Sequence, residues 1–163
     1  MAVKMDLTQK RRIFNEWHKL VNMTKRELEL WCQNPWRRRA SLGAKRAAEA
    51  GVYSGLRSLR NITRKRDMPL IRWGAREFRE AAREIAFNTR MLGVSPGRPV
   101  TKNIPMSRWE ISLRNWGHDP RKDSSTAYDK INRWWRQYFG DKKAPSSRAV
   151  IRAAAQAEAP AKA

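Results

Sequence analysis

This sequence has little cysteine and little histidine, and both scarcities exclude a class of protein. The single cysteine, Cys32, cannot form an intramolecular disulfide, which excludes a small disulfide-stabilised fold. Its place beside Trp31 in an apolar pattern predicts a buried small hydrophobe. With one Cys and two His, the chain cannot assemble a zinc site of ordinary ligand spacing, so we expect no metal and no cofactor.

Long apolar runs are missing as well. No stretch of about 18 apolar residues occurs, which argues against a membrane-spanning helix. Residues 1–6 lack the apolar stretch of a signal peptide. We therefore expect a protein that is neither secreted nor membrane-spanning, and that works in the bacterial cytoplasm, on the nucleoid or inside a virion.

Motifs of catalysis are also lacking. The chain contains no phosphate loop, no nucleophile elbow and no dinucleotide fingerprint. The pair His118-Asp119 raises the question of a nuclease or metal site, but adjacent side chains rarely converge on one ion. Asp119 precedes Pro120, which is typical of a turn or a helix cap. We expect that this protein is not an enzyme.

Positive charge is what the chain has in excess. It carries 36 Lys and Arg against 15 Asp and Glu, a net charge of +21. The excess is +7 in each of the segments 1–50, 51–100 and 101–163, so it belongs to the whole chain. Such a chain repels itself without a polyanion, which makes nucleic acid the expected partner. Arg outnumbers Lys by 24 to 12, and the planar guanidinium suits bidentate contact with phosphate.

The apolar residues predict an all-α fold. They make up 40% of the chain and include 8 Trp, enough to bury a core. They recur at helical spacing over residues 7–21, from Thr24 to the stop at Asn34-Pro35, and over 52–65 and 72–92. Two shorter aromatic segments, 107–116 and 125–139, show the same spacing. Residues 36–50 are rich in Ala, and their helix propensity predicts a further helix. Thr24 and Glu27 predict a capping box at the second helix.

Gly and Pro divide the chain into regions. Five of these residues between 93 and 105 predict an extended surface linker over 93–106. Before it we expect a basic, helical, nucleic-acid-binding domain over 1–92, and after it an aromatic helical subdomain over 107–140. Residues 141–163, rich in Ala, Pro, Ser, Lys and Arg without an apolar stripe, are expected to form a flexible tail.

Basic residues of the first region form two groups. Arg57, Arg60 and Arg64 are three and four residues apart and would share one helix face, from which they could follow successive phosphates. The alternative is a solvated face without a ligand, and the net charge favours binding. The second group begins with a contiguous triplet that suits a loop or helix start lying over the backbone. The expected contacts are Arg37, Arg38, Arg39, Lys45, Arg46, Arg57, Arg60, Arg64, Lys65 and Arg66.

Basic and aromatic residues alternate again near the end of the second region. Trp134 lies on one stripe with Ile131 and Tyr138, the spacing of a core, whereas Trp135 is about 100° away on the helix and is expected to be exposed. An exposed ring beside cations can stack on a base, and packing is the alternative. Arg133, Trp135 and Arg136 are therefore further candidate contacts.

Two stretches resemble a known family. They read WHKLVNMTKRELELW over residues 17–31 and GVYSGLRSL over 51–59. They resemble the DUF3140-like proteins, small bacterial and phage proteins described as DNA-binding, and the resemblance covers residues 13–92. In the family pattern a Gly-Ser-Gly element precedes a basic helix, which corresponds here to Gly51, Ser54 and Gly55. The family's Arg-His near the end of the long helix is replaced by Asn88-Thr89-Arg90. The C-terminal stretch ISLRNWGHDP over residues 111–120 looks like an extension found in phage-encoded relatives.

The resemblance implies DNA rather than RNA and a phage or bacterial origin. The main hypothesis is a sequence-nonspecific DNA-binding protein that holds the phosphate backbone through arginine-rich helices. The alternative is a structural component of a virion or large ribonucleoprotein, in which the basic surface neutralises packaged nucleic acid or rRNA and the Trp residues contact other subunits.

Overall fold

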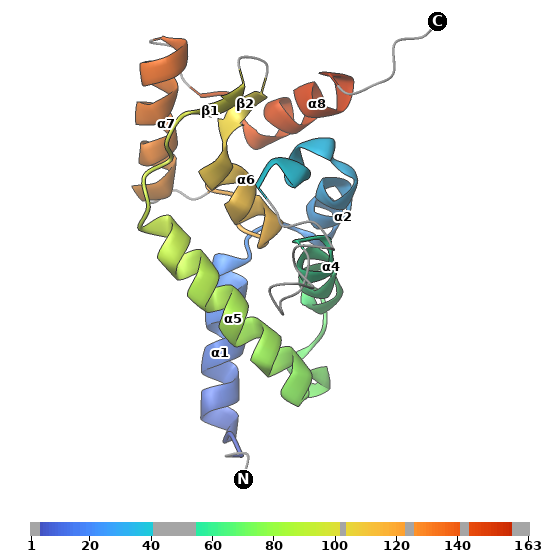
Figure 1. Ribbon diagram of the computed structural model, residues 1–163. Coiled ribbons are helices and arrows are strands. Elements are labelled where there is room, and N and C mark those ends of the chain that lie inside the picture. The colour runs from blue at the N-terminus through green and yellow to red at the C-terminus, as the bar shows by residue number, and fades with distance from the viewer. Residues whose placement is uncertain (1–3, 41–54, 102–103, 123–125, 141–143, 158–163) are drawn as a thin grey trace, which may run out of the picture.

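Helices make up most of the computed structural model, which describes residues 4–40, 55–101, 104–122, 126–140 and 144–157 (Figure 1). The predicted all-α fold is confirmed, with one small two-stranded hairpin added. No helix in these described ranges is both long and apolar enough to cross a membrane. The elements in chain order are α1 (Leu7–Leu20), α2 (Lys25–Gln33), the 3-10 helix η1 (Pro35–Ala40), α4 (Gly55–Lys65), the 3-10 helix η2 (Leu70–Arg72), α5 (Ala75–Leu92), β1 (Pro99–Thr101), β2 (Ile104–Ser107), α6 (Arg108–Asn115), α7 (Thr126–Phe139) and α8 (Ser147–Ala157).

Local side-chain bonds define where the helices begin and end. The predicted capping box at α2 is present, with the Glu27 amide donating to Thr24 and the Thr24 amide donating to the Glu27 carboxylate. Helix α2 ends before Pro35, and the Asn34 side-chain oxygen accepts a hydrogen bond from the Trp36 amide at 2.9 Å. The helix expected over residues 36–50 begins here as the 3-10 helix η1, and residues 41–50 lie outside the described ranges.

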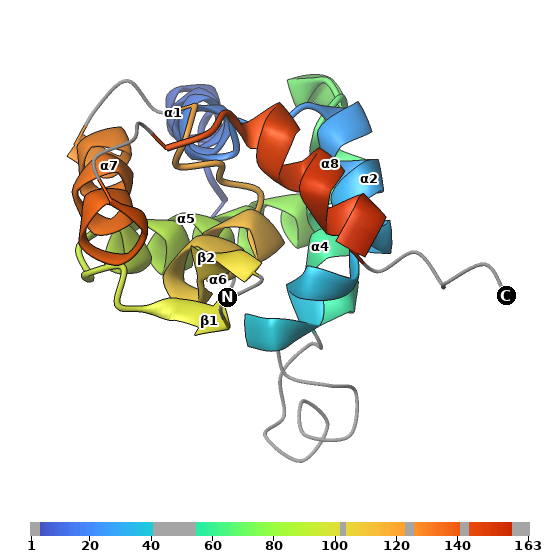
Figure 2. The ribbon, with the colours of Figure 1, turned by 90° about the horizontal axis from the view of Figure 1, so that it is seen from above.

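The main core draws side chains from both halves of the chain. Trp17 of α1, Leu59 of α4 and Ile111 of α6 are fully buried in one cluster. Helix α1 lies along α5, and α6 occupies the middle of the molecule with α7 on one side and the α2–α8 pair on the other (Figures 1 and 2). A second, smaller cluster lies under α7 and contains Trp109 and Ile131.

The extended surface linker expected over residues 93–106 is wrong for its second half, whereas residues 93–98 form no helix or strand and are mostly exposed. Strand β1 pairs antiparallel with β2, and Thr101 lies opposite Ile104. Ile104 and Met106 are buried in the main core, because alternate residues of a strand point to one face. Pro105 is compatible with this strand, since both strands of a two-stranded sheet are edges. The apolar residues before and after this segment therefore share one core.

The flexible tail expected from residue 141 is also wrong for its central part. Helix α8 occupies Ser147–Ala157, and Val150 is only 1% exposed within the main core. An alanine-rich sequence has high helix propensity, and the burial of Val150 in the core adds tertiary packing that stabilises the helix. Residues 141–143 and 158–163 lie outside the described ranges.

Gly117 allows the turn after α6 to approach α1 and α4 closely. Its φ is +83°, and a Cβ at this position would lie 2.8 Å from Val21 Cγ1 and 3.0 Å from Ile62 Cγ2. Its carbonyl accepts a hydrogen bond from the Met23 amide at 3.2 Å. Glycine is required here both for its backbone conformation and for the missing side chain.

Candidate nucleic-acid interface

Lys65 is excluded as a phosphate contact, contrary to the sequence-based expectation. Its side chain is 0% exposed, and its Nζ lies 2.8 Å from Glu80 Oε2 and 2.7 Å from Glu84 Oε1. Residue 65 lies one turn beyond Ile62 on the buried face of α4, so the lysine points into the protein. The acidic partners come from α5 and are distant in sequence.

The neighbouring charges of α4 are also compensated within the protein. Arg64 forms ion pairs with Glu77 at 3.0 Å and Glu80 at 3.1 Å, and its side chain is 37% exposed. Arg66 is half-buried, and its Nε donates to the Met23 carbonyl at 2.8 Å. These two arginines therefore join the end of α4 to α5 and to the segment between α1 and α2, which is a different role from the phosphate contacts expected of them.

In the buried ion cluster of Lys65, Glu80 and Glu84, the pKa values of the two carboxyl groups are shifted in opposite directions. Burial raises the pKa of Glu84 to about 7, although Lys65 and the Trp17 indole, which donates at 3.0 Å, both favour the carboxylate. Burial also raises the pKa of Glu80, but hydrogen bonds from Lys65 and Arg76 outweigh it and leave this pKa below its ordinary value. Lys65 thus pairs with two carboxyl groups, of which Glu80 is the stronger acid and Glu84 the weaker.

Arg37, Arg38 and Arg60 form a cluster of like charges, here called the arginine cluster. Burial, followed by the charges of Arg38 and Arg60, lowers the pKa of the Arg37 guanidinium. Arg38 and Arg60 are exposed, as is Arg39 next to them. Within the described ranges, no carboxylate forms an ion pair with any of these four arginines. The cluster is therefore a concentration of positive charge without a counter-ion from the described part of the protein.

Asn115 of α6 helps to place this cluster. Its side-chain nitrogen donates to the Arg37 carbonyl at 2.9 Å, and its side-chain oxygen accepts from the Trp31 indole at 2.8 Å. The Trp36 side chain is buried beneath η1, and the Arg37 Nε donates to the Cys32 carbonyl at 2.8 Å. With Trp36 fixing the inner side of η1, Arg38 and Arg39 project outward. No local sequence pattern indicated this role for Asn115.

Three predicted contacts of the N-terminal region remain, namely Arg57, Lys45 and Arg46. Arg57 is exposed on α4, one turn before Arg60. Lys45 and Arg46 lie outside the described ranges. Cys32, expected to be a buried hydrophobe, is half-buried and packs against the main core.

A second row of exposed arginines lies on α5 and was not proposed from the sequence. Arg76, Arg79, Arg83 and Arg90 are separated by three, four and seven residues, so they share one helix face. Arg76 pairs with Glu80 at 2.9 Å, and Arg90 lies over the Phe87 ring at 6.0 Å. The same spacing rule that suggested the α4 stripe indicates this one in the sequence.

The aromatic helix α7 matches its prediction only in part. Trp134 is 4% exposed, as expected for the core position. Trp135 is half-buried rather than exposed, with its ring 4.3 Å from Phe139 and the Arg121 Cζ 5.6 Å over it. These contacts occupy the ring, so Trp135 is a packing residue. The neighbouring candidates that remain exposed are Arg133 and Arg136.

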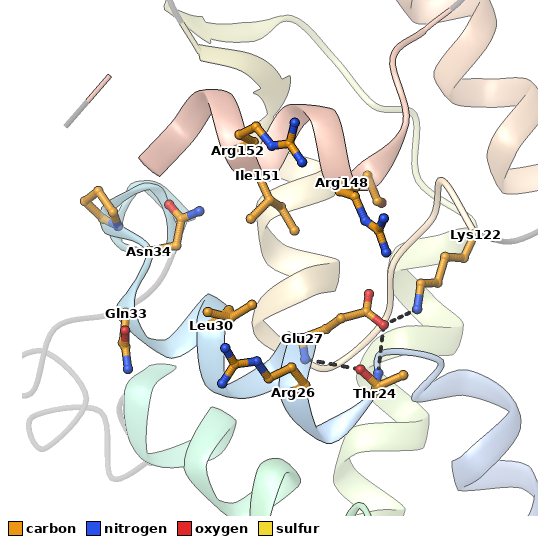
Figure 3. A pocket seen from close by; sticks show the side chains of 12 residues that line it. Thr24, Arg26, Glu27, Leu30, Gln33, Asn34, Lys122, Arg148, Ile151 and Arg152 are labelled. Atoms are coloured by element: carbon orange, nitrogen blue, oxygen red, sulfur yellow. Dashed lines mark hydrogen bonds and ion pairs between the residues drawn. The ribbon is translucent and has the colours of Figure 1, made fainter. Parts of the chain in front are cut away.

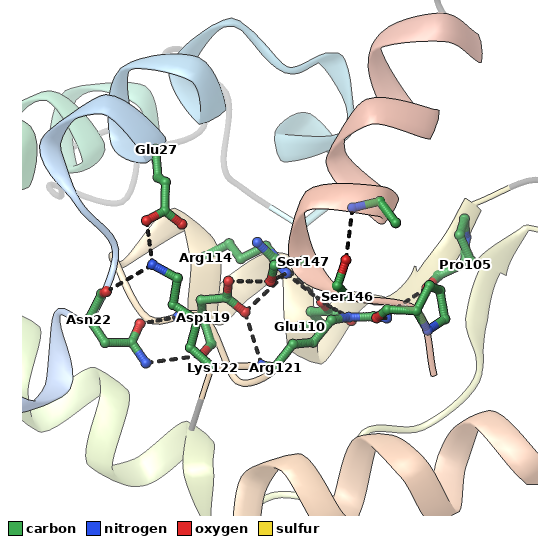
Figure 4. A network of polar contacts seen from close by, with 12 residues as sticks. Asn22, Glu27, Pro105, Glu110, Arg114, Asp119, Arg121, Lys122, Ser146 and Ser147 are labelled. Atoms are coloured by element: carbon green, nitrogen blue, oxygen red, sulfur yellow. Dashed lines mark hydrogen bonds and ion pairs between the residues drawn. The ribbon is translucent and has the colours of Figure 1, made fainter. Parts of the chain in front are cut away.

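His118 and Asp119 are both buried and do not line an open cleft, and Asp119 belongs to a buried polar network (Figure 4). Asp119 Oδ1 accepts from Arg114 Nη2 at 3.1 Å and from the Arg121 amide at 2.9 Å, which confirms the predicted turn. The Ser147 hydroxyl donates to the other oxygen of Asp119 and so anchors α8. His118 Nδ1 lies 2.6 Å from the Leu20 carbonyl oxygen.

The two arginines of this network share one glutamate. Arg114 Nη2 lies 3.0 Å from Glu110 Oε2, and Arg121 Nε lies 2.7 Å from the same oxygen. Burial lowers the pKa of Arg114, but the charges of Asp119 and Glu110 outweigh it and raise the pKa overall. The network holds α6, the turn after it and α8 together.

Comparison of this chain with models of known protein families yields no match, and neither the curated proteins nor the solved structures provide one.

Proposed function

We propose that this protein binds nucleic acid without base specificity, and that the arginine cluster is its main contact with the phosphate backbone. The proposal is carried by the exposure of Arg38 and Arg60, whose charges both act on Arg37, and by the lack of a carboxylate partner for the three among the described residues. Like charges at short range destabilise one another. A phosphate group between them would remove that repulsion and accept hydrogen bonds from the guanidinium groups.

The net charge of +21 supports the same proposal. A protein that neutralises phosphates releases condensed counterions, and this release supplies most of the free energy of nonspecific binding. Contacts to phosphate carry no direct information about base sequence. Duplex DNA is the expected polymer, with the exposed arginines next to the cluster, Arg39 and Arg57, as additional contacts.

The test is the salt dependence of binding to a fluorescent DNA duplex of about 20 base pairs, followed by anisotropy. The test variant carries Arg38→Ala, Arg39→Ala and Arg60→Ala, all at exposed positions. Loss of three phosphate contacts should reduce the slope of log affinity against log salt by about 2.7, since each contact contributes about 0.9. Arg37 is left in place because it also bonds to the Cys32 carbonyl.

The control variant carries Arg11→Ala, Arg12→Ala and Lys19→Ala on the exposed side of α1 and removes the same charge. It should change the slope by less than half as much. Equal losses in the two variants would show that total charge, and not this cluster, determines binding. A duplex RNA of the same sequence tests the choice of polymer.

A further inference from the structure

A groove of about 1110 Å³ separates α2 from α8 (Figure 3). Its walls are formed by residues of the two helices together with Pro35 and Lys122. It is distinct from the arginine cluster, none of whose members lines it. The Ser147 hydroxyl, which donates to buried Asp119, and Val150, buried in the main core, hold α8 in place. The groove is therefore preformed by fixed elements.

The interior of the groove is apolar. Leu30 of α2 is 43% exposed, and Ile151 of α8 faces it across the groove (Figure 3). Pro35 adds a third apolar side chain. Two large aliphatic side chains facing each other in a hollow are typical of a surface that binds another apolar side chain.

The edges of the groove are basic. Arg26, Arg148 and Arg152 are exposed, and none of the three forms an ion pair with a carboxylate in the part of the chain that the structure describes. The lining carries one carboxylate, Glu27, and Lys122 pairs with it at one end of the groove. Burial raises the pKa of Glu27, but hydrogen bonds from Lys122 and Thr24 outweigh it and lower the pKa overall, so this charge is compensated.

We propose that the α2–α8 groove binds an acidic amphipathic helix of a partner protein. Apolar side chains of that helix would contact Leu30 and Ile151, and its carboxylates would pair with Arg26, Arg148 and Arg152. Helix α8 has 11 residues and is roughly 16 Å long at about 1.5 Å per residue, which matches about three turns of a bound helix.

A protein ligand fits this groove better than a nucleic acid does. Single-stranded nucleic acid is bound by aromatic side chains on which successive bases stack. The described lining of this groove contains aliphatic side chains and no aromatic one. Leucine or isoleucine side chains spaced at i, i+4 and i+7 on a helix meet an aliphatic interior more favourably.

The test measures binding of the full chain to a fluorescein-labelled helical peptide of about 14 residues, with leucines at i, i+4 and i+7 and glutamates at most other positions. Two variants alter the groove: Leu30→Glu, and the pair Arg148→Glu with Arg152→Glu. The matched control is Arg79→Glu with Arg83→Glu on α5, which are also exposed and four residues apart. Thermal melts verify that each variant is folded.

The groove variants should weaken peptide binding by roughly tenfold or more, and the control by less than twofold. A scrambled peptide of the same composition should bind at least roughly tenfold more weakly than the amphipathic one. Equal losses in groove and control variants, equal binding of the scrambled peptide, or no saturable binding would overturn the proposal. So would loss of oligo(dT) binding specifically in the groove variants, which would make the groove a nucleic-acid site. The duplex-binding slopes of the arginine-cluster variant report separately on the proposed function.

Discussion

Replacement of Glu84 by glutamine should remove a decline in stability between about pH 4.5 and pH 7. Burial raises the pKa of this carboxyl from an ordinary 4.5 to about 7. Between these two values the folded protein holds a proton that the unfolded chain has released. The folded state therefore binds more protons, and the free energy of unfolding falls as pH rises. At about 1.4 kcal/mol per tenfold change in acidity, the decline reaches about 3 kcal/mol.

The other perturbed carboxyl groups act in a different pH range. Burial by itself raises the pKa values of Glu27, Glu77 and Glu80, but hydrogen bonds from neighbouring groups lower them by more. The net result is a pKa below the ordinary value for each of the three. Their contribution to stability is fully present above about pH 4.5 and is lost as the pH falls through their folded pKa values. Among the carboxyl groups with shifted pKa values, only Glu84 therefore contributes a decline above pH 4.5.

The assay is urea denaturation at several pH values from 5 to 8, for the wild-type protein and Glu84→Gln. Glutamine retains an acceptor for the Trp17 indole, which donates to this side chain at 3.0 Å. Glu29→Gln, at an exposed position on α2, is the control and should leave the decline intact. If Glu84→Gln shows the same decline as the wild type, the carboxyl is not protonated in the folded protein near neutral pH and the reasoning fails.

Three further predictions concern packing and are tested by chemical denaturation. Gly117→Ala should cost about 1–3 kcal/mol more than Gly140→Ala, because both residues have positive φ but only the Cβ at Gly117 meets neighbouring atoms. Asp119→Ala should cost about 3–5 kcal/mol, because it removes one of the two carboxylates paired with buried Arg114 and the acceptor of the Ser147 hydroxyl. Trp134→Ala should cost about 3–5 kcal/mol and half-buried Trp135→Ala clearly less, so equal costs would contradict the assignment of only Trp134 to the core.

The periodicity of the apolar residues allowed the all-α fold class to be predicted from the sequence. Helical spacing of apolar residues is a local property, and the hydrogen bonds of an α-helix join residues only four apart. For that reason the helix over residues 7–21, the capping box at Thr24 and the long helix ending near Leu92 could be predicted. The docking of α8 was missed, because Val150, which is buried in the main core, forms no apolar stripe within its own segment.

The role of each positive charge was decided by tertiary structure. Arg60 and Lys65 look equivalent in the sequence, yet Arg60 is exposed near Arg37 while Lys65 is buried against Glu80 and Glu84. Net charge is a sum over residues and is fixed by composition, so it indicates a polyanionic partner but not a site. Whether a given cation is paired inside the protein or left for a ligand depends on carboxylates that approach only when helices pack. The α2–α8 groove has the same origin, since Leu30 and Ile151 are far apart in the chain and meet only in the folded protein.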